Sequence, residues 1–423
     1  MPELINEQKV CAVKSAEDLH AFMKDIEKFS LKTLLLRVFL IGWVALANVA
    51  LALLKYLLFK TSGYKTKDHR NIVVYTVGIV GDNVAMLPAL AAVRRRYPQA
   101  YLTVITNCQT WSQRAAEGIL GPSRFKDRLI ILDDDPVQRQ GIHFIIADKR
   151  LTELKCDLFV NLSPFGNRGV IGTVMREIIF AKKIGAQYAV GFKMATYSKR
   201  GIFNKVQYHF VQNEPRRPRK VLKELGLMPA ENEDLFASDS SAQGLVREKI
   251  HALCRPEKDF FVINPGAKFK AKCWPAERFG AVAKHIGQSF NAFSVVTGAL
   301  EEQDIIAEVT KSSGGFGVNL ADGTTLQELA ELLRMARGCV TNDTGTMHMA
   351  AMIGIPTIAI FSMRHSPTHW LPIGKNVIVL FTTPDCICCY DDYCDTSECL
   401  KLIETSDVIR ALQEVLAASN AKK

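Results

Sequence analysis

Two separate stretches of the chain alternate short apolar runs with helix-like segments, and this alternation limits the fold more than any other feature. In the first stretch the uncharged runs are Ile72–Val77 and Leu102–Thr106. In the second stretch they are Phe260–Asn264 and Ala292–Thr297. Runs of this kind separated by helices are typical of βαβ units built on a parallel sheet. We therefore expect an α/β protein with two Rossmann-like domains that face a cleft.

The 423 residues divide into five segments. Residues 1–65 form an N-terminal extension, and residues 70–211 form the first Rossmann-like domain. Residues 212–256 form a polar, basic linker region. Residues 257–403 form the second Rossmann-like domain, and a terminal helix occupies residues 404–423. This length suits two domains better than a single core.

The N-terminal extension contains one long apolar run, Val38–Leu54, in which Asn48 is the only strongly polar residue. A membrane-spanning helix needs ~20 apolar residues, so this run lies near the lower limit. Basic residues flank it on both sides: Lys32, Arg37, Lys55 and Lys60. We expect a membrane-associated helix, inserted or in plane, and prefer this to the alternative of a helix buried in a core.

Charge and cysteine content restrict the partners and the compartment. The formal net charge of +10 favours anionic partners such as phosphates or an acidic membrane surface. The chain has neither an arginine-rich tail nor a zinc-finger pattern, so we expect no nucleic acid partner. Most of the 11 cysteines are scattered singly, which suits a reducing compartment.

Two local signals predict helix starts. Thr325 and Glu328 have the spacing of a capping box, which predicts a helix beginning at that point. After the strand Ile72–Val77, Pro88 interrupts the following helical stretch. We expect the regular part of that helix to begin at Pro88.

The first motif that could take part in catalysis is the turn Gly78-Ile79-Val80-Gly81-Asp82, which follows the strand Ile72–Val77. Gly78 and Gly81 allow a sharp turn and a close approach of the backbone to a ligand. Asp82 stands at the carboxyl end of a strand, where α/β sheets place functional groups. The alternative is that Asp82 only caps the next helix.

The second motif is Asn342-Asp343-Thr344-Gly345, which leads into a helix that carries His348. Free N–H groups at a helix start favour an anion such as a diphosphate, and Thr344 and Gly345 could donate hydrogen bonds to it. The alternative is that Asp343 caps the helix and His348 packs against a strand.

The third motif is a set of three lysines, Lys268, Lys270 and Lys272, after a strand that ends in Pro-Gly. A lysine there can neutralise a phosphate. We select Lys272 for this role and expect the other two to be solvated. Trp274 is expected in the core.

A cysteine cluster lies in a loop at residues 385–400. Cys386, Cys389, Cys394 and Cys399 could bind a structural zinc ion as four thiolates. Disulfides and reduced thiols remain equally open interpretations.

Together these motifs resemble glycosyltransferase family nine, the heptosyltransferases of lipopolysaccharide assembly. The resemblance runs from about Asn71 to the C-terminus, in four motifs that occur in the family's order. They are VGIVGDNVAMLPALAAVRRRYP, INPGAKFKAKCWPAERF, VTGALEEQD and NDTGTMHMAAMIGIPTIAIF. The chain departs from the family pattern at Thr76, where many members have a basic residue, and in its long N-terminal extension.

The resemblance implies a GT-B architecture, with residues 70–211 on the acceptor side and residues 257–403 binding the nucleotide sugar. It implies an inverting transfer from a nucleotide sugar, ADP-heptose above others, to a lipid-linked saccharide, with no cofactor required. It also implies action at the cytoplasmic face of the bacterial inner membrane. Asp82 would be the general base, and Glu301 would bind the nucleoside. The other donor-binding residues would be Lys272, Asp343, Thr344, Gly345 and His348.

Two alternatives use the same fold. One is a sugar-nucleotide epimerase or hydrolase, which needs no acceptor. The other is a non-catalytic sugar-nucleotide-binding membrane protein.

Overall fold

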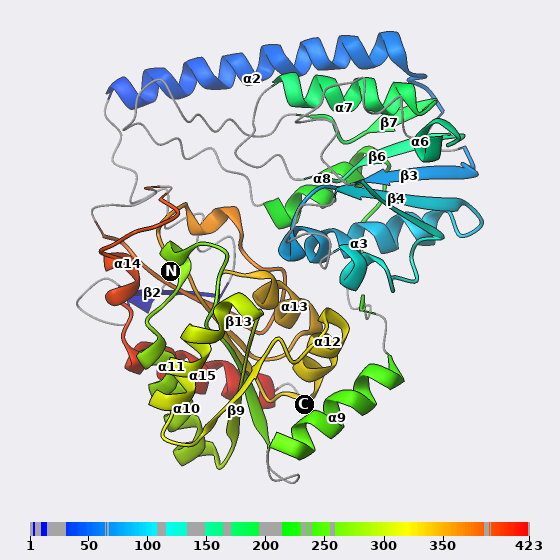
Figure 1. The fold of residues 1–423 in the computed structure, drawn as a ribbon. Helices are drawn as coiled ribbons and strands as arrows, with labels where there is room; N and C mark the ends of the chain where they lie inside the picture. The colour runs from blue at the N-terminus through cyan, green and yellow to red at the C-terminus, as the bar shows by residue number, and fades with distance from the viewer. Residues whose placement is uncertain are drawn as a thin grey trace. The chain divides into compact units, whose positions relative to one another are not determined.

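The chain folds into two compact units, which Figure 1 draws as ribbons. The computed structural model describes residues 3–4, 10–14, 31–63, 65, 67–107, 116–132, 149–163, 171–193, 214–229, 235–236, 239–253, 259–384, 389 and 391–421. The C-terminal unit comprises Met1–Ile26 and Phe236–Lys423, and the central unit comprises Glu27–Leu235. Each unit is built on a mainly parallel sheet, so the prediction of an α/β chain with two Rossmann-like domains is confirmed.

The C-terminal unit contains an eight-stranded sheet in the order β1-β2-β13-β12-β11-β8-β9-β10. Its parallel strands are β8 Phe260–Asn264, β9 Phe293–Gly298, β10 Gly317–Ala321, β11 Cys339–Asn342, β12 Thr357–Ile360 and β13 Val377–Thr382. Every residue of β8, β11, β12 and β13 is buried, as expected for parallel strands covered on both faces. Numbered from β8, the six parallel strands have the Rossmann order 3-2-1-4-5-6, which places a topological switch point between β8 and β11.

Helix α9 precedes the parallel strands of the C-terminal unit, and the other helices of this unit lie between or after them. They are α9 Ser240–Leu253, α10 Ala276–Phe290, α11 Gln303–Ser312, α12 Leu326–Met335, α13 Gly345–Ile353, α14 Glu398–Lys401 and α15 Thr405–Asn420. The capping box at the start of α12 is confirmed: Thr325 Oγ1 accepts the Glu328 N–H at 3.2 Å, and Glu328 Oε2 accepts the Thr325 N–H at 2.7 Å. The terminal helix α15 packs against α10 and joins the core of this unit.

The central unit contains a five-stranded parallel sheet in the order β5-β4-β3-β6-β7. Its strands are β3 Asn71–Tyr75, β4 Tyr101–Asn107, β5 Arg128–Leu132, β6 Leu158–Asn161 and β7 Tyr188–Val190. Its helices are α2 Leu31–Leu58, α3 Val80–Arg96, α6 Lys149–Thr152, α7 Ile171–Lys183 and α8 Arg217–Glu224, with a π-helical turn at Ala116–Leu120. Helices α2 and α7 lie on one face of the sheet and α3 on the other (Figure 1).

The N-terminal extension is divided between the two units instead of forming one segment. Strand β2, Val10–Val13, pairs antiparallel with β13 and so extends the sheet of the C-terminal unit. Strand β1, Glu3–Leu4, pairs with β2. The apolar run folds into α2, which belongs to the central unit. Within the described residues, no helix combines the length and the apolarity needed to cross a membrane.

The expected start of a helix at Pro88 is wrong. Helix α3 begins at Val80, and Pro88 lies inside it. The reason is the carboxylate of Asp82, whose Oδ2 accepts the N–H of Ile79 at 2.7 Å and so satisfies a donor of the first turn.

Candidate active site

Except for Glu301, the residues of the C-terminal unit that were selected from the sequence gather at the switch point of its sheet. Asn264 ends β8, and Asn342 ends β11. The two strands are neighbours in the sheet and parallel, so their carboxyl ends meet at one edge. In open α/β sheets this edge is the usual ligand site.

The two asparagines fix the loops that leave these strands. Asn264 Nδ2 donates to the carbonyl of Thr297 at 2.9 Å, and its Oδ1 accepts from Thr344 Oγ1 at 3.2 Å. Asn342 Nδ2 donates to the carbonyl of Pro265 at 2.6 Å, and its Oδ1 accepts from the N–H of Trp274 at 3.2 Å. Both side chains are buried, so these bonds hold the loops in one arrangement.

Lys272 and Asp343 form a buried ion pair at this edge. Lys272 Nζ lies 2.6 Å from Asp343 Oδ2, and the two side chains are 13% and 5% exposed. Lys272 ends a short 3₁₀ turn, Lys270–Lys272, that places its ammonium toward β11. Trp274 is fully buried, so its expected core position is confirmed. Lys268 and Lys270 are exposed, and of the three lysines only Lys272 lies in this buried pair.

The charge of Asp343 is maintained by its neighbours. Burial raises the pKa of this carboxyl, but the ammonium of Lys272 and the nearby ring of His365 outweigh that effect, and the net shift is downward. His365 Nε2 lies 3.6 Å from Asp343 Oδ2. Asp343 is therefore a carboxylate that orients Lys272 before any ligand arrives.

Two buried histidines beside this pair are held neutral. Burial lowers the pKa of His348 to about 4, and the charge of Asp343 only partly opposes this. Burial and Lys272 lower the pKa of His365 to about 3. His348 lies on α13 with its ring edge-to-face with Trp370, at a centroid distance of 6.3 Å. At neutral pH both imidazoles therefore supply hydrogen-bonding groups without net charge.

The start of α13 can bind an anion next to Lys272. Thr344 is the N-cap residue, but its side chain makes no capping hydrogen bond, because its hydroxyl is bonded to Asn264 and Thr341 instead. Thr344 and Gly345 are partly exposed, whereas Asp343 and His348 are buried. A helix start with uncapped N–H groups, a hydroxyl and an oriented ammonium is suited to a diphosphate.

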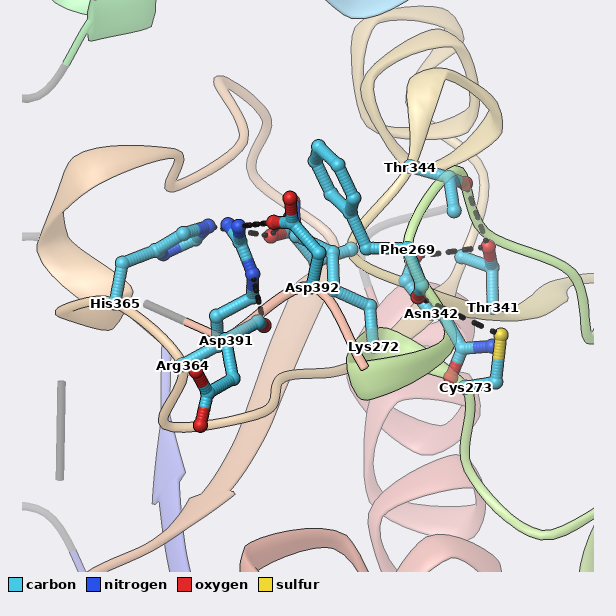
Figure 2. Close-up of polar contacts among 11 residues, drawn as sticks. Phe269, Lys272, Cys273, Thr341, Asn342, Thr344, Arg364, His365, Asp391 and Asp392 are labelled. Carbon is cyan, nitrogen blue, oxygen red and sulfur yellow. Dashed lines mark hydrogen bonds and ion pairs between the residues drawn. The ribbon is translucent and has the colours of Figure 1, made fainter. Parts of the chain in front are cut away.

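A second cation near this edge, Arg364, was not found from the sequence. Arg364 Nε donates to the carbonyl of Asp391 at 2.6 Å, and its Nη2 pairs with the carboxylate of Asp392 (Figure 2). Its guanidinium lies 4.3 Å from the ring centroid of Phe269. The carbonyl of Asp392 also accepts the N–H of Ala271, so this loop supports the turn that carries Lys272. Arg364 lies outside the four motifs, and only its position just after β12 could have indicated a role.

Glu302, rather than Glu301, lies at the strand ends. Glu301 is exposed. Glu302 Oε2 accepts the N–H of Ala299 at 2.9 Å, and a Cβ added to Gly266 or Gly298 would meet the Glu302 carboxylate at 2.0 or 2.7 Å. Burial raises the pKa of Glu302, and the Ala299 N–H bond only partly offsets this. The sequence alone contains no signal that decides between Glu301 and Glu302, because the two residues are adjacent.

The glycine turn lies at the corresponding edge of the central unit. Gly78 has φ +151°, and a Cβ at this position would meet Asp82 Cβ at 2.3 Å, so only glycine fits. Gly81 is buried in the first turn of α3, and Asp82 is half-buried and bonded to Ile79. The capping role considered for Asp82 is thus present, and it leaves a carboxylate at the end of β3. Thr76, where the family pattern has a basic residue, is fully buried.

The cysteine cluster is only partly described, since Cys386 lies outside the described residues. Cys389, Cys394 and Cys399 are not in disulfides, and the described part of the chain contains no group of three or more metal-ligating side chains. Among the scattered thiols, burial raises the pKa of Cys273 and Cys11 to about 11 and of Cys156 to about 12. These thiols are unreactive at neutral pH.

Comparison with known proteins identifies a family. The model of glycosyltransferase family 9 (heptosyltransferase) matches residues 178–399. Lipooligosaccharide heptosyltransferase 2 of Campylobacter jejuni is 26% identical over 228 residues, which cover 51% of this chain and 70% of the relative.

Solved structures share the fold. The family 9 glycosyl transferase of Veillonella parvula aligns with a TM-score of 0.64 and 20% identity, covering 85% of this chain and 99% of that one. The ADP-heptose lipopolysaccharide heptosyltransferase II of Escherichia coli aligns with a TM-score of 0.56 and 18% identity, covering 83% and 99%.

Proposed function

The chain belongs to glycosyltransferase family 9, the heptosyltransferase family, and from this premise we propose that it transfers a heptose from ADP-heptose to a lipid-linked saccharide. The acceptor is a growing lipopolysaccharide or related glycolipid, and the reaction takes place at the cytoplasmic face of the bacterial inner membrane. The heptosyltransferase relatives support the sugar, and the E. coli ADP-heptose heptosyltransferase supports the donor. That the chain is a glycosyltransferase follows from family membership.

The observation that carries the proposal is the Lys272–Asp343 pair at the start of α13. A nucleotide-sugar donor releases a diphosphate, whose negative charge grows as the bond to the sugar breaks. Lys272, paired with Asp343, and the partly exposed Thr344 and Gly345 lie at the same edge of the sheet, and in this proposal the diphosphate contacts all three. Asp343 and His348 hold this arrangement, and neither adds a positive charge of its own.

Asp82 takes the role of general base in this reaction. It removes the proton from the acceptor hydroxyl as that oxygen attacks the anomeric carbon. The bond between this carbon and the diphosphate oxygen breaks, and ADP leaves with the bonding electrons. Attack from the face opposite the leaving group inverts the anomeric configuration. The sequence-based choice for binding the nucleoside of the donor was Glu301. The position of Glu302 at the strand ends supports Glu302 for this role instead, and Glu301 is the alternative.

A transfer assay with purified protein tests the proposal. The protein is incubated with ADP-heptose and a heptose-accepting lipopolysaccharide precursor, and the acceptor is analysed by mass spectrometry for one added heptose. Asp82→Asn should lower turnover by ~10²–10⁴-fold while donor affinity is retained. Release of free heptose without any acceptor, or full turnover in Asp82→Asn, would contradict the proposal.

A further inference from the structure

Helix α2 presents a continuous apolar face to solvent. Its exposed large side chains are Trp43 at 45%, Leu46 at 67%, Val49 at 58%, Leu53 at 60%, Tyr56 at 68% and Leu57 at 78%. We call these six residues the α2 outer face. The residues between them on the same side are Gly42, Ala45, Ala50 and Ala52, all exposed. No charged residue interrupts this side from residue 42 to residue 54. An exposed apolar surface of this extent marks an interaction site.

The opposite side of α2 is part of the core of the central unit. Ala47 and Leu51 are buried in one cluster with Val174 and Ile178 of α7. The two helices run side by side in Figure 1. To leave this position, α2 would have to expose that cluster to water, which costs free energy in proportion to the apolar area uncovered.

Polar contacts also fix the C-terminal end of α2. Lys55 Nζ lies 3.9 Å from the carboxylate of Glu224 on α8 and 5.7 Å from the ring centroid of Phe192. Lys182 Nζ donates to the carbonyl of Leu58 at 2.8 Å. The helix is therefore held at both its buried side and its end, and the α2 outer face is the side available to a partner.

The surroundings of α2 are basic. Exposed lysines follow the helix and end the neighbouring α7: Lys60, Lys65, Lys67, Lys182 and Lys183. A second copy docked by two-fold symmetry would bring like charges together, which is unfavourable. An anionic lipid surface would neutralise them. The aromatic side chains Trp43 and Tyr56 stand about 20 Å apart along the helix, given a rise of ~1.5 Å per residue, and such side chains favour the headgroup region.

We propose that the α2 outer face docks the protein in the plane of an anionic phospholipid bilayer. The apolar side chains enter the boundary between headgroups and acyl chains, as in interfacial amphipathic helices, and the neighbouring lysines contact lipid phosphates. The choice of a lipid surface as partner rests on the proposed function, which places the acceptor in a membrane. The docking keeps the central unit next to lipid-linked acceptor molecules.

Vesicle flotation with the full chain tests this docking. The protein should float with phosphatidylcholine vesicles that contain phosphatidylglycerol, and less with phosphatidylcholine alone. The double variant Leu46→Glu/Leu53→Glu should bind roughly tenfold more weakly or worse, since two membrane-buried leucines are replaced by charges. The matched control Met228→Glu/Leu245→Glu changes two side chains that are 67% and 46% exposed elsewhere, and it should bind like the parent. Circular dichroism of each variant establishes that helix content is retained.

The outcomes separate the docking from the reaction. Parent-like flotation of Leu46→Glu/Leu53→Glu would overturn the docking. The docking would also be overturned if the parent protein does not bind vesicles but forms a dimer in sedimentation velocity, and the variant is monomeric. Turnover on a delipidated, water-soluble acceptor should be the same in the variant and the parent. If the protein binds vesicles through α2 but transfers no heptose, the docking stands and the proposed function fails.

Discussion

Replacing Lys272 by methionine should destabilise the C-terminal unit as well as weaken donor binding. The substitution keeps most of the side-chain volume but leaves the Asp343 carboxylate buried without its cation. Removal of one partner from a buried ion pair typically costs about 3–5 kcal/mol. Because Asp343 is only 5% exposed, little solvent screening reduces this cost. The loss of stability should approach the upper end of this range unless Asp343 takes up a proton.

Proton uptake by Asp343 gives the variant a pH signature. Without Lys272, burial dominates and raises the pKa of Asp343 above its unfolded value. Stability is then retained at low pH and lost as pH rises through the raised pKa, so the gap to the parent should widen between pH 5 and pH 8. The double variant Lys272→Met/Asp343→Asn should be more stable than the sum of the two single changes predicts, by about 0.5–3 kcal/mol.

Urea unfolding followed by tryptophan fluorescence measures these free energies. In a background with Trp43→Phe and Trp111→Phe, the remaining Trp274 and Trp370 report on the C-terminal unit. Lys311→Met provides the control, because Lys311 pairs with Glu308 at 3.6 Å while its side chain is 80% exposed. Such surface pairs contribute about 0–1 kcal/mol. Equal stability of Lys272→Met and Lys311→Met, or strict additivity in the double variant, would refute the stabilising interaction between Lys272 and Asp343.

Three further changes test the geometry of the site. His348 and His365 have lowered pKa values of about 4 and 3. The free energy of unfolding should therefore fall as pH drops from 6.5 toward 4, by up to roughly 1.4 kcal/mol per pH unit for each histidine. A free energy of unfolding that does not change over this pH range would contradict this. Gly78→Ala should cost about 1–3 kcal/mol and reduce turnover, because its Cβ would displace Asp82, whereas Gly244→Ala in open helix α9 should be neutral or stabilising. Glu302→Gln should weaken ADP binding, measured by calorimetry, by roughly tenfold or more, because a charged hydrogen bond contributes about 1.5–3 kcal/mol. Glu301→Gln should leave ADP binding unchanged. The reverse result would assign nucleoside binding to Glu301.

Local patterns were sufficient to predict most of the fold. The apolar runs became β3, β4, β8 and β9, because an uncharged run of that length can bury both faces in a parallel sheet. The capping box at Thr325 fixed the start of α12, since its two hydrogen bonds involve only nearby residues. Lys272 was selected over two neighbouring lysines because it precedes the buried Trp274.

Features that depend on distant residues were not predictable in this way. The pairing of β2 with β13 joins the start of the chain to a strand near its end, and neither sequence signals the other. The interaction of Arg364 with Asp392 depends on how two loops leave the sheet. The choice between Glu301 and Glu302 is set by a turn of the backbone that positions one carboxylate against Gly266.

The excess positive charge of the chain is not concentrated at the proposed donor site. There Lys272 is matched by Asp343, Arg364 is matched by Asp392, and both buried histidines are neutral. The proposed binding of a diphosphate would therefore depend on a preorganised ammonium, a hydroxyl and helix N–H groups more than on net charge. Exposed lysines instead lie beside α2, where an anionic surface can use them. The two charge distributions suit the two partners proposed above, a single nucleotide sugar held by geometry and an extended lipid surface attracted by charge.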